Sequence, residues 1–326
     1  MWSRWSWVRV PSATPSSAVK ILAPRRFPGP AWDELADVEY YEGPLPGPRP
    51  DIEALAVVGE TIDAPMLERF PNLRLVANYG AGYDGIDVVA CAAAGVPVTN
   101  TPGVLDAATA DLTLALILAT RRRVVESDSF VRAGRWGTDW ASTTLLAQDA
   151  SGATLGIVGL GHIGTAVARR ARGFDLRLLY TQREHLAETE ERKLGVEFRA
   201  LDDLLREADI VTLHVPLKAD TEGLLDRRRL ALLRDGSCLV NTARGAIVDE
   251  DALVEELASG RIRAGLDVFA HEPDVPQQLL ELPNVVLTPH LGSATWETRE
   301  AMTRVLVDNL KAAAAGKELP NPVYPS

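Results

Sequence analysis

The sequence predicts an α/β protein with two lobes, each built on a largely parallel β-sheet. Short apolar runs alternate with helix-like stretches along residues 18–102, and the same alternation returns more regularly along residues 152–293. A glycine-rich turn follows the first apolar run of the second region and precedes a helical pattern. A chain of 326 residues is long enough for two such lobes.

Composition and charge are those of an ordinary globular protein, with 46% hydrophobic and 24% charged residues. The net charge of −11 argues against a nucleic-acid partner. The longest apolar stretch, residues 112–120, is too short to span a bilayer, so we expect no membrane partner. The two cysteines, Cys91 and Cys238, lack metal-ligand spacing, which predicts no metal and favours a reducing, cytoplasmic setting.

Residues 1–17 differ from the rest of the chain. The stretch lacks the apolar core of a signal peptide, because Arg4, Arg9 and Pro11 interrupt it. We therefore expect a disordered extension, followed by the first strand-like segment from Val19.

The first lobe contains four apolar runs that we expect to be strands. They are "VKILAP", "ALAVVG", "LRLVANYG" and "VPVTNTPG". A helical pattern follows from Asp106 to Arg123, with an acidic start and three arginines in the final turn, as a helix macrodipole favours. Asp106 opens this helix and can cap it, so we interpret it as structural.

The second lobe contains six apolar runs with helical candidates between them. They are "TLGIVGL", "LRLLYT", "DIVTLHV", "SCLVNTA", "AGLDVF" and "NVVLTPH". Six strands with intervening helices match a doubly wound parallel sheet. A long amphipathic helix follows from Thr295 to Gly316, and we expect it to return and pack on the first lobe.

The stretch "GIVGLGHIGTAVARR" has the spacing G-x-G-x-x-G at Gly159, Gly161 and Gly164. The first glycine permits a tight turn, the second lets a pyrophosphate approach the backbone, and the third lets helix and strand pack closely. The start of the following helix then offers N–H groups to the phosphates. The motif therefore predicts a Rossmann dinucleotide-binding unit.

The second strand of such a unit usually ends in an acidic residue that binds the ribose of NAD. Here the tip reads Thr181, Gln182 and Arg183. An arginine offers a fork of donors that matches a 2′-phosphate, and either neighbour can add a neutral hydrogen bond. We therefore predict that NADP is preferred over NAD. The alternatives are that Arg183 is a solvated surface residue, or that Glu184 turns inward and serves NAD.

Polar residues follow the last three strands, at the edge of the sheet where ligands bind. Arg244, Glu272 and His290 together suggest the reduction of a 2-keto acid. The arginine would hold the carboxylate and polarise the carbonyl, the histidine would donate a proton, and the glutamate would support the protonated imidazole. His214 and His271 lack such a context, and we interpret both as structural.

With these motifs in place, the sequence resembles the D-isomer-specific 2-hydroxyacid dehydrogenase family. The resemblance covers nearly everything from residue 19 to the end, although the family often has threonine at the position of Asp106. The matching stretches are "NYGAGYDGIDV", "VTNTPGVLDAATADLTLALILATRR", "TLGIVGLGHIG", "LHVPLKADTEGLL", "LVNTARGAIVDEDAL", "AGLDVFAHEP" and "LTPHLGSAT".

The resemblance implies a Rossmann domain and a smaller flavodoxin-like α/β substrate-binding domain. The expected boundaries are residues 18–102 for the substrate-binding domain, 103–293 for the dinucleotide-binding domain with its linking helix, and 294–326 for the helix that returns to the first domain. Because the chain ends about where a two-lobed core should end, no appended regulatory domain is expected.

The resemblance also implies the site residues, beginning with Arg244, Glu272 and His290 as the catalytic set. Backbone amides around Tyr79, Gly80 and Ala81 would hold the substrate carboxylate. In addition to the glycine loop and the strand tip, the expected cofactor-binding residues are Thr109, His162, Ile163, Val215, Pro216, Thr221, Thr242, Ala243 and Asp267.

The glyoxylate and hydroxypyruvate reductases of the family look most similar at the strand tip, and their resemblance implies a homodimer. Trp140 of the partner subunit would reach the substrate, whereas the alternative is a core aromatic. We expect reduction of glyoxylate or hydroxypyruvate to the D-2-hydroxy acid. A phosphoglycerate dehydrogenase-type enzyme and a dinucleotide-sensing regulatory protein on the same fold remain alternatives; formate oxidation is disfavoured.

Overall fold

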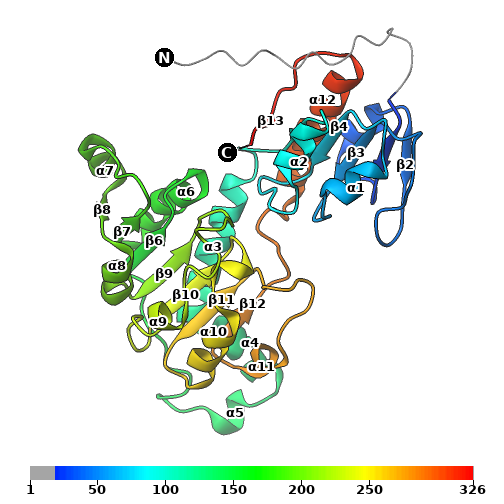
Figure 1. Cartoon of the computed structure of the whole chain (residues 1–326). Helices are drawn as coiled ribbons and strands as arrows, with labels where there is room; N and C mark the ends of the chain where they lie inside the picture. The colour runs from blue at the N-terminus through cyan, green and yellow to red at the C-terminus, as the bar shows by residue number, and fades with distance from the viewer. Residues whose placement is uncertain (1–18, 326) are drawn as a thin grey trace. The chain divides into compact units, whose positions relative to one another are not determined.

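The computed structural model describes residues 19–325, so the extension predicted at residues 1–17 lies outside the described residues. The described chain divides into two compact units. Unit 1 comprises the residues up to Leu105 and those from Ala294 onward, and unit 2 comprises Asp106–Ser293. Figure 1 labels the helices and strands of both units.

Unit 1 is built on a six-stranded sheet in the order β13-β5-β4-β3-β1-β2. The strands are β1 Ile21–Ala23, β2 Val38–Tyr40, β3 Ala54–Val57, β4 Leu75–Asn78, β5 Val98–Thr99 and β13 Pro322–Val323. The first five are parallel and have the 2-1-3-4-5 order of flavodoxin-like folds, which confirms the predicted class. β13 pairs antiparallel with β5. β2 and β13 were not predicted, because a glutamate interrupts β2 and a proline begins β13, so neither is an apolar run.

Four helical segments lie in the described part of unit 1. They are η1 Pro30–Glu34, α1 Ala64–Glu68, α2 Val88–Ala93 and α12 Trp296–Ala314. The side chain of Thr295 caps α12 by accepting a hydrogen bond from the Thr298 amide. Two hydrogen bonds join this helix to the end regions of β4: the Tyr79 hydroxyl donates to the Arg299 carbonyl at 2.8 Å, and Arg74 donates to the Ala313 carbonyl at 3.1 Å.

Unit 2 is built on a seven-stranded parallel sheet in the order β12-β11-β10-β9-β6-β7-β8. The strands are β6 Thr154–Val158, β7 Arg177–Thr181, β8 Val196–Phe198, β9 Ile210–Leu213, β10 Cys238–Asn241, β11 Arg263–Leu266 and β12 Val285–Leu287. This is the doubly wound 3-2-1-4-5-6 order with one further strand, which confirms the predicted Rossmann class. All six predicted strands are present, and only the three-residue edge strand β8 was missed.

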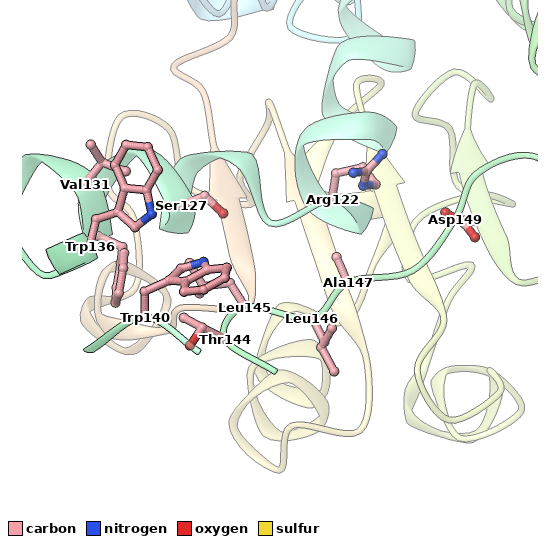
Figure 2. A pocket seen from close by; sticks show the side chains of 11 residues that line it. Arg122, Ser127, Val131, Trp136, Trp140, Thr144, Leu145, Leu146, Ala147 and Asp149 are labelled. Carbon is pink, nitrogen blue, oxygen red and sulfur yellow. The ribbon is translucent and has the colours of Figure 1, made fainter. Parts of the chain in front are cut away.

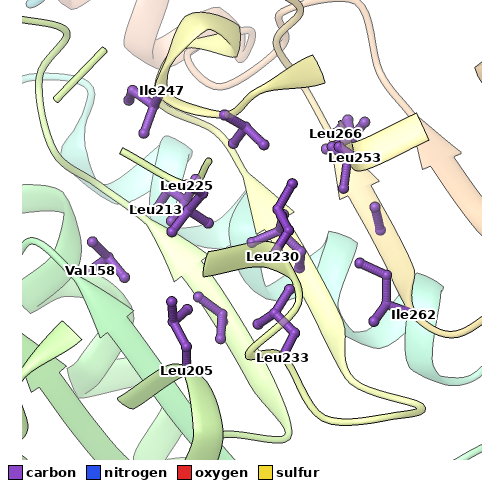
Figure 3. Packing of buried hydrophobic residues seen from close by; sticks show 14 of the residues in the cluster. Val158, Leu205, Leu213, Leu225, Leu230, Leu233, Ile247, Leu253, Ile262 and Leu266 are labelled. Carbon is purple, nitrogen blue, oxygen red and sulfur yellow. The ribbon is translucent and has the colours of Figure 1, made fainter. Parts of the chain in front are cut away.

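Helices pack on both faces of this sheet. The helical segments of unit 2 are α3 Asp106–Arg121, α4 Val124–Arg132, α5 Trp136–Asp139, α6 His162–Ala171, η2 Arg172–Phe174, α7 Glu188–Leu194, α8 Leu201–Glu207, α9 Arg227–Leu230, η3 Gly245–Ile247, α10 Glu250–Ala258 and α11 Gln277–Glu281. Two apolar clusters fill the space between sheet and helices, one of which Figure 3 shows. Leu179 of β7 belongs to one cluster, and its neighbours Leu178 and Tyr180 belong to the other, because successive strand residues point to opposite faces.

Helix α3 begins at Asp106, as predicted, but it ends before the predicted Arg123. Asp106 is the first residue of the helix, and its negative charge is favourable at the N-terminal end of the helix dipole. Only Arg121 of the three arginines lies in the helix. Arg123 adopts a left-handed conformation with φ of 52°, which ends one helix and begins α4. In the described part of the chain, no helix combines the length and the apolar character needed to cross a membrane.

Candidate active site

The glycine loop lies where the order of strands in unit 2 reverses, between β6 and α6. A side-chain carbon at Gly159 would lie 2.8 Å from a methyl group of Val215, and the residue has φ of 93°. A side-chain carbon at Gly164 would lie only 2.1 Å from the carbonyl oxygen of Gly159. Gly159 must therefore be glycine because of its conformation and its packing, and Gly164 must be glycine because helix and strand meet there.

Gly161 differs from the other two glycines, because an added side-chain carbon would meet no atom within 4 Å. It is the N-cap of α6, whose first amides have no partners within the helix. Packing therefore does not require glycine here, and the bare backbone leaves room beside a helix N-terminus. This is the arrangement that a dinucleotide pyrophosphate needs, so the loop fits the predicted cofactor.

The strand tip is tied to this loop, since the Gly159 amide donates to the Thr181 carbonyl at 2.9 Å. Thr181 itself is buried. The side-chain amide of Gln182 donates to the Glu184 carbonyl at 2.6 Å. By contrast, the Arg183 side chain is 80% exposed, and its nearest carboxylate oxygen, on Asp220, lies 3.6 Å away. Of the three tip residues, the arginine has the side chain most accessible to a ligand.

His290 and Glu272 form a close pair beyond β12 and β11. The Nδ1 atom of His290 lies 2.7 Å from Glu272 Oε2, and the Phe269 amide donates to the other carboxylate oxygen at 3.1 Å. Burial raises the pKa of Glu272, but hydrogen bonds to it and the charges of His290 and Arg244 outweigh burial and lower it. Glu272 is therefore an ionised acceptor, which leaves the imidazole Nε2 as the atom available for proton transfer.

The backbone of His290 is held in the left-handed region, with φ of 54°. A residue other than glycine occupies this region rarely, and the surrounding structure must then fix it. Here Asp267 does so: its backbone carbonyl accepts from the His290 amide at 2.8 Å, and its carboxylate accepts from the amides of Leu291 and Gly292 at 2.7 and 2.9 Å.

Asp267 therefore has a structural role that was not predicted. Its side chain is fully buried, and the Thr288 hydroxyl adds a third hydrogen bond at 2.5 Å. Burial raises the pKa of this carboxyl against the lowering effect of its hydrogen bonds. Because the described residues engage both carboxylate oxygens, Asp267 positions the loop of His290, and its contact with the cofactor stays a prediction.

Arg244 follows β10 and has an extended backbone, with its Nη1 donating to the Ala243 carbonyl at 2.7 Å. The side chain of Asn241 holds this turn from both sides: it donates to the Arg244 carbonyl at 2.8 Å and accepts from the Ala243 amide at 3.0 Å. A side-chain carbon at Gly245 would lie 1.9 Å from the Phe269 carbonyl carbon. The turn that carries the arginine thus packs directly on the loop that carries Glu272.

Sequence reasoning missed Asn241 and Gly245 as parts of this site. Both stand in the stretch "NTARG", which was noted for its arginine. An asparagine at a strand end with a glycine a few residues later was the available signal, because both residue types are common in turns. Asn241 contacts its own turn, whereas Gly245 packs against Phe269, which follows the neighbouring strand and lies far away in the sequence.

The other predicted cofactor residues gather around the same edge of the sheet. Thr109 donates to the Gly292 carbonyl at 3.2 Å, and the hydroxyls of Thr113 and Thr242 lie 3.0 Å apart. Thr221 donates to the Pro216 carbonyl at 2.6 Å. Val215 lies against Gly159, and Ala243 is half-buried beside Arg244. Ile163 packs on a core cluster. His162 is exposed, and its Nδ1 atom lies 3.9 Å from the Asp106 carboxylate.

The remaining two histidines agree with a structural interpretation. His214 is half-buried, and its Nε2 lies 2.6 Å from the Thr212 hydroxyl. Burial lowers the pKa of His214 to about 3, so the imidazole is neutral at physiological pH. His271 is exposed and is separate from the pair formed by Glu272 and His290 in the hydrogen bonds of the described chain.

In unit 1, the segment predicted to hold a carboxylate follows β4. The Tyr79 amide donates to the Val57 carbonyl at 2.8 Å, and its ring stacks on Phe27 with centroids 4.2 Å apart. This amide is therefore occupied, and the prediction that it binds substrate is wrong. The amides of Gly80 and Ala81 have no hydrogen-bond partner among the described residues, so they remain able to receive an anion.

The family model for D-isomer-specific 2-hydroxyacid dehydrogenases, NAD binding domain, matches residues 114–292, which lie within unit 2. The chain belongs to this family. The dehydrogenase is 48% identical over 272 residues to a glyoxylate reductase of Pyrococcus horikoshii, covering 82% of this chain and 81% of that protein. It is 44% identical over 315 residues to a glyoxylate reductase of Pyrococcus furiosus, covering 95% and 93%.

Solved structures give the same result. The dehydrogenase aligns with a Thermus thermophilus protein with a TM-score of 0.85 and 45% identity, over 93% of this chain and 99% of the other. It aligns with a Sinorhizobium meliloti NADPH-dependent glyoxylate/hydroxypyruvate reductase, in complex with NADP and malonate, with a TM-score of 0.82 and 36% identity, over 94% and 97%. The dehydrogenase is thus an oxidoreductase that uses a nicotinamide dinucleotide.

Trp140 of the dehydrogenase lies on the surface of unit 2. Its side chain is 62% exposed, so the alternative of a core aromatic is wrong. Figure 2 shows Trp136 and Trp140 beside Val131 and Leu145 at a cavity of about 520 Å³. The exposed large apolar side chains between α3 and β6 are Val124, Val125, Val131, Trp136, Trp140 and Leu146.

Proposed function

We propose that this dehydrogenase reduces glyoxylate or hydroxypyruvate to the D-2-hydroxy acid, with NADPH as the preferred cofactor. The observation that carries the proposal is the pair of His290 and Glu272 at 2.7 Å, with the charge of Arg244 acting on the same carboxylate. The names of the relatives from Pyrococcus and Sinorhizobium support the choice of substrate and cofactor. The two buried, unpaired cysteines support a reducing, cytoplasmic location.

Arg244 and His290 divide the reaction between them. When bound, the reduced nicotinamide supplies a hydride to the carbonyl carbon of the substrate. Arg244 binds the substrate carboxylate and draws electron density toward the carbonyl oxygen. His290 gives the proton on Nε2 to that oxygen, while Nδ1–H continues to donate to Glu272. The glutamate stays ionised throughout, so it stabilises the protonated imidazole before the transfer and orients the neutral one afterwards.

The amides of Gly80 and Ala81 are the proposed second anchor for the substrate carboxylate. Their support is the absence of a hydrogen-bond partner for either amide within the described chain. Backbone N–H groups bind an anion without adding bulk, and glycine lets the ligand approach closely. A substrate with a small side chain fits this proposal because the carboxylate supplies most of its polar contacts.

The proposed activity is tested on the full-length chain with a panel of glyoxylate, hydroxypyruvate, 3-phosphohydroxypyruvate and pyruvate. Loss of nicotinamide absorbance is followed with NADPH and with NADH. We expect the highest kcat/KM with glyoxylate or hydroxypyruvate and NADPH. A preference for the phosphorylated acid would replace the proposal with a phosphoglycerate dehydrogenase-type activity. Tight dinucleotide binding with no turnover of any acid would indicate a dinucleotide-sensing protein.

Cofactor preference gives a prediction for Arg183. Replacing it with alanine removes the cation that would pair with the 2′-phosphate, so kcat/KM with NADPH should fall by about tenfold to a hundredfold. The value with NADH should change by less than about twofold, because NADH has no such phosphate. The measurement is catalytic efficiency with both cofactors before and after the substitution.

Two further variants make the Arg183 result specific. Arg192→Ala removes another exposed arginine that pairs with a surface carboxylate at 3.4 Å, and it should leave both efficiencies unchanged. Asp220→Asn removes the carboxylate 3.6 Å from Arg183 but keeps the cation, so NADPH should remain preferred. Equal losses with the two cofactors in Arg183→Ala, or a native preference for NADH, would contradict the proposal.

We also propose that the dehydrogenase is a homodimer and that Trp140 of the partner subunit reaches the substrate. The support is the exposed apolar group around Trp136 and Trp140, because monomers rarely expose several large apolar side chains together. Trp140→Ala should alter the ratio of kcat/KM values for glyoxylate and hydroxypyruvate by about threefold or more.

The control for this prediction is Trp296→Ala, which removes a tryptophan that is also exposed but belongs to unit 1. It should leave the substrate ratio and the mass unchanged. Light scattering coupled to size exclusion gives the mass of each variant. A monomeric wild type, or a Trp140 variant with unaltered kinetics on every substrate, would refute the proposal.

A further inference from the structure

The backbone that follows β4 is held by its carbonyl groups. The Gly80 carbonyl accepts from the Thr101 amide at 3.0 Å and from the Asn78 side chain at 3.1 Å. The same Asn78 amide nitrogen donates to the Gly82 carbonyl at 2.8 Å. The Asn100 side chain donates to the Ala81 carbonyl at 2.8 Å. Two asparagine side chains thus hold three successive carbonyl oxygens.

Fixing a carbonyl also fixes the next amide. The peptide unit is planar and trans, so the C=O of one residue and the N–H of the following residue point in opposite directions. The bonds to the Gly80 carbonyl therefore turn the Ala81 N–H away from Asn78. The bond from Asn100 to the Ala81 carbonyl likewise turns the Gly82 N–H away from Asn100. Within the described chain, neither of these amides has a hydrogen-bond partner.

The burial of the two asparagines agrees with a fixed arrangement. Asn78 is the last residue of β4 and is 5% exposed, whereas Asn100 is half-buried directly after β5. An Asn78 amide that donates to two carbonyl oxygens has its orientation set, since its own carbonyl could make neither bond. By contrast, the Ala81 and Gly82 positions are partly or fully exposed, so their amides can meet a ligand.

We propose that Asn78 and Asn100 are positioning residues for the substrate carboxylate. Through the Gly80 and Ala81 carbonyls they direct the amides of Ala81 and Gly82 as an anion-binding pair. The inference rests on the proposed function, because it concerns the carboxylate of the 2-keto acid. It adds the Gly82 amide to the proposed anchor of Gly80 and Ala81, in place of the occupied Tyr79 amide, and it names the side chains that orient the Ala81 and Gly82 amides.

The test compares substrate binding with turnover in the full-length enzyme. Asn78→Ala removes both donors and should raise the KM for glyoxylate by about tenfold. The dissociation constant of oxamate, a carboxylate that cannot be reduced at this site, should rise by a similar factor. The KM for NADPH should stay within about twofold, and kcat should fall less than the KM rises. Asn78→Ser keeps one hydroxyl donor and should recover part of the loss.

Asn72→Ala is the matched control, because Asn72 also donates its side-chain amide to a carbonyl of unit 1, that of Pro50 at 2.7 Å. It should leave every constant unchanged. If Asn78→Ala fails to fold, Asn100→Ala provides the same test, since it removes one bond from a half-buried position. Unchanged glyoxylate and oxamate constants in a folded variant would overturn the inference.

The two proposals fail in different ways. Calorimetric titration of oxamate onto the wild type and the asparagine variants, with NADP⁺ present, measures carboxylate binding without turnover. A wild type that binds oxamate but reduces neither keto acid would overturn the proposed function alone. Oxamate binding that is equally tight in wild type and variants would overturn the role of the asparagines alone.

Discussion

Replacing Arg244 by alanine is expected to lower kcat/KM for glyoxylate by about a thousandfold, or about 4 kcal/mol of transition-state stabilisation. The loss is large because one guanidinium both binds the carboxylate and polarises the carbonyl, and each contact is charge-assisted. The measurement is steady-state reduction with saturating NADPH. Turnover close to that of the wild type would show that the arginine has another role.

The fold should survive the Arg244 substitution. The turn that carries this residue is held by Asn241 through backbone atoms of Ala243 and Arg244, which alanine keeps. The melting temperature and the affinity for NADPH should therefore change little. Arg244→Lys is the informative partner variant: it keeps the charge but loses the planar fork, so it should recover only part of the activity.

Replacing His290 by alanine is expected to lower kcat by about a hundredfold to ten-thousandfold, the range that general acid catalysis usually supplies. Cofactor affinity should be unchanged, because the imidazole is paired with Glu272 rather than with the glycine loop. Stopped-flow reduction and NADPH binding, measured on the same preparation, separate the two effects. If the substitution abolishes NADPH binding but leaves the turnover of the NADPH-bound enzyme unchanged, the histidine has a structural role.

The rates of reduction and oxidation should depend on pH in opposite directions. Reduction of the keto acid takes up one proton, so kcat/KM for the keto acid should fall as pH rises. Oxidation of the hydroxy acid should rise over the same interval, because it releases that proton. The pKa of Glu272 is lowered, so its carboxylate persists into the acidic range and keeps supporting the protonated form.

Glu272→Gln is the control for this assignment. The amide can still accept the hydrogen bond from Nδ1, but it lacks the negative charge that favours a protonated imidazole. The falling limb of the reduction profile should therefore move to lower pH, with a smaller loss of rate than in His290→Ala. A profile that stays in place would mean that the charge of Glu272 does not act on the proton donor.

The sequence by itself determined the fold class and the central chemistry. The central strands of unit 2 are buried on both faces, so they read as continuous apolar runs, and all six predicted runs proved to be strands. The glycine spacing predicted a turn that packing requires at Gly159 and Gly164. The proposed catalytic residues could be named from the sequence because parallel strands bring their carboxyl ends to one edge, whatever lies between them in the chain.

Only the tertiary structure decided what these groups contact. The Tyr79 amide is occupied by Val57, a contact between neighbouring strands that no local pattern reveals. Gly245 must be glycine because Phe269 lies against it. The buried carboxylate of Asp267 holds the loop of His290, although its sequence position suggested a cofactor contact.

The short strands and the exposure of Trp140 were likewise decided by the tertiary structure. β2, β8 and β13 have two or three residues each, and each forms because a neighbouring strand offers unpaired backbone groups. The exposure of Trp140 likewise depends on where the segment between α3 and β6 lies. Local composition fixes which residues prefer burial or a turn, but contacts between distant segments fix which amide, carboxylate or ring remains available. Which of these groups can meet a ligand is therefore decided only in the folded chain.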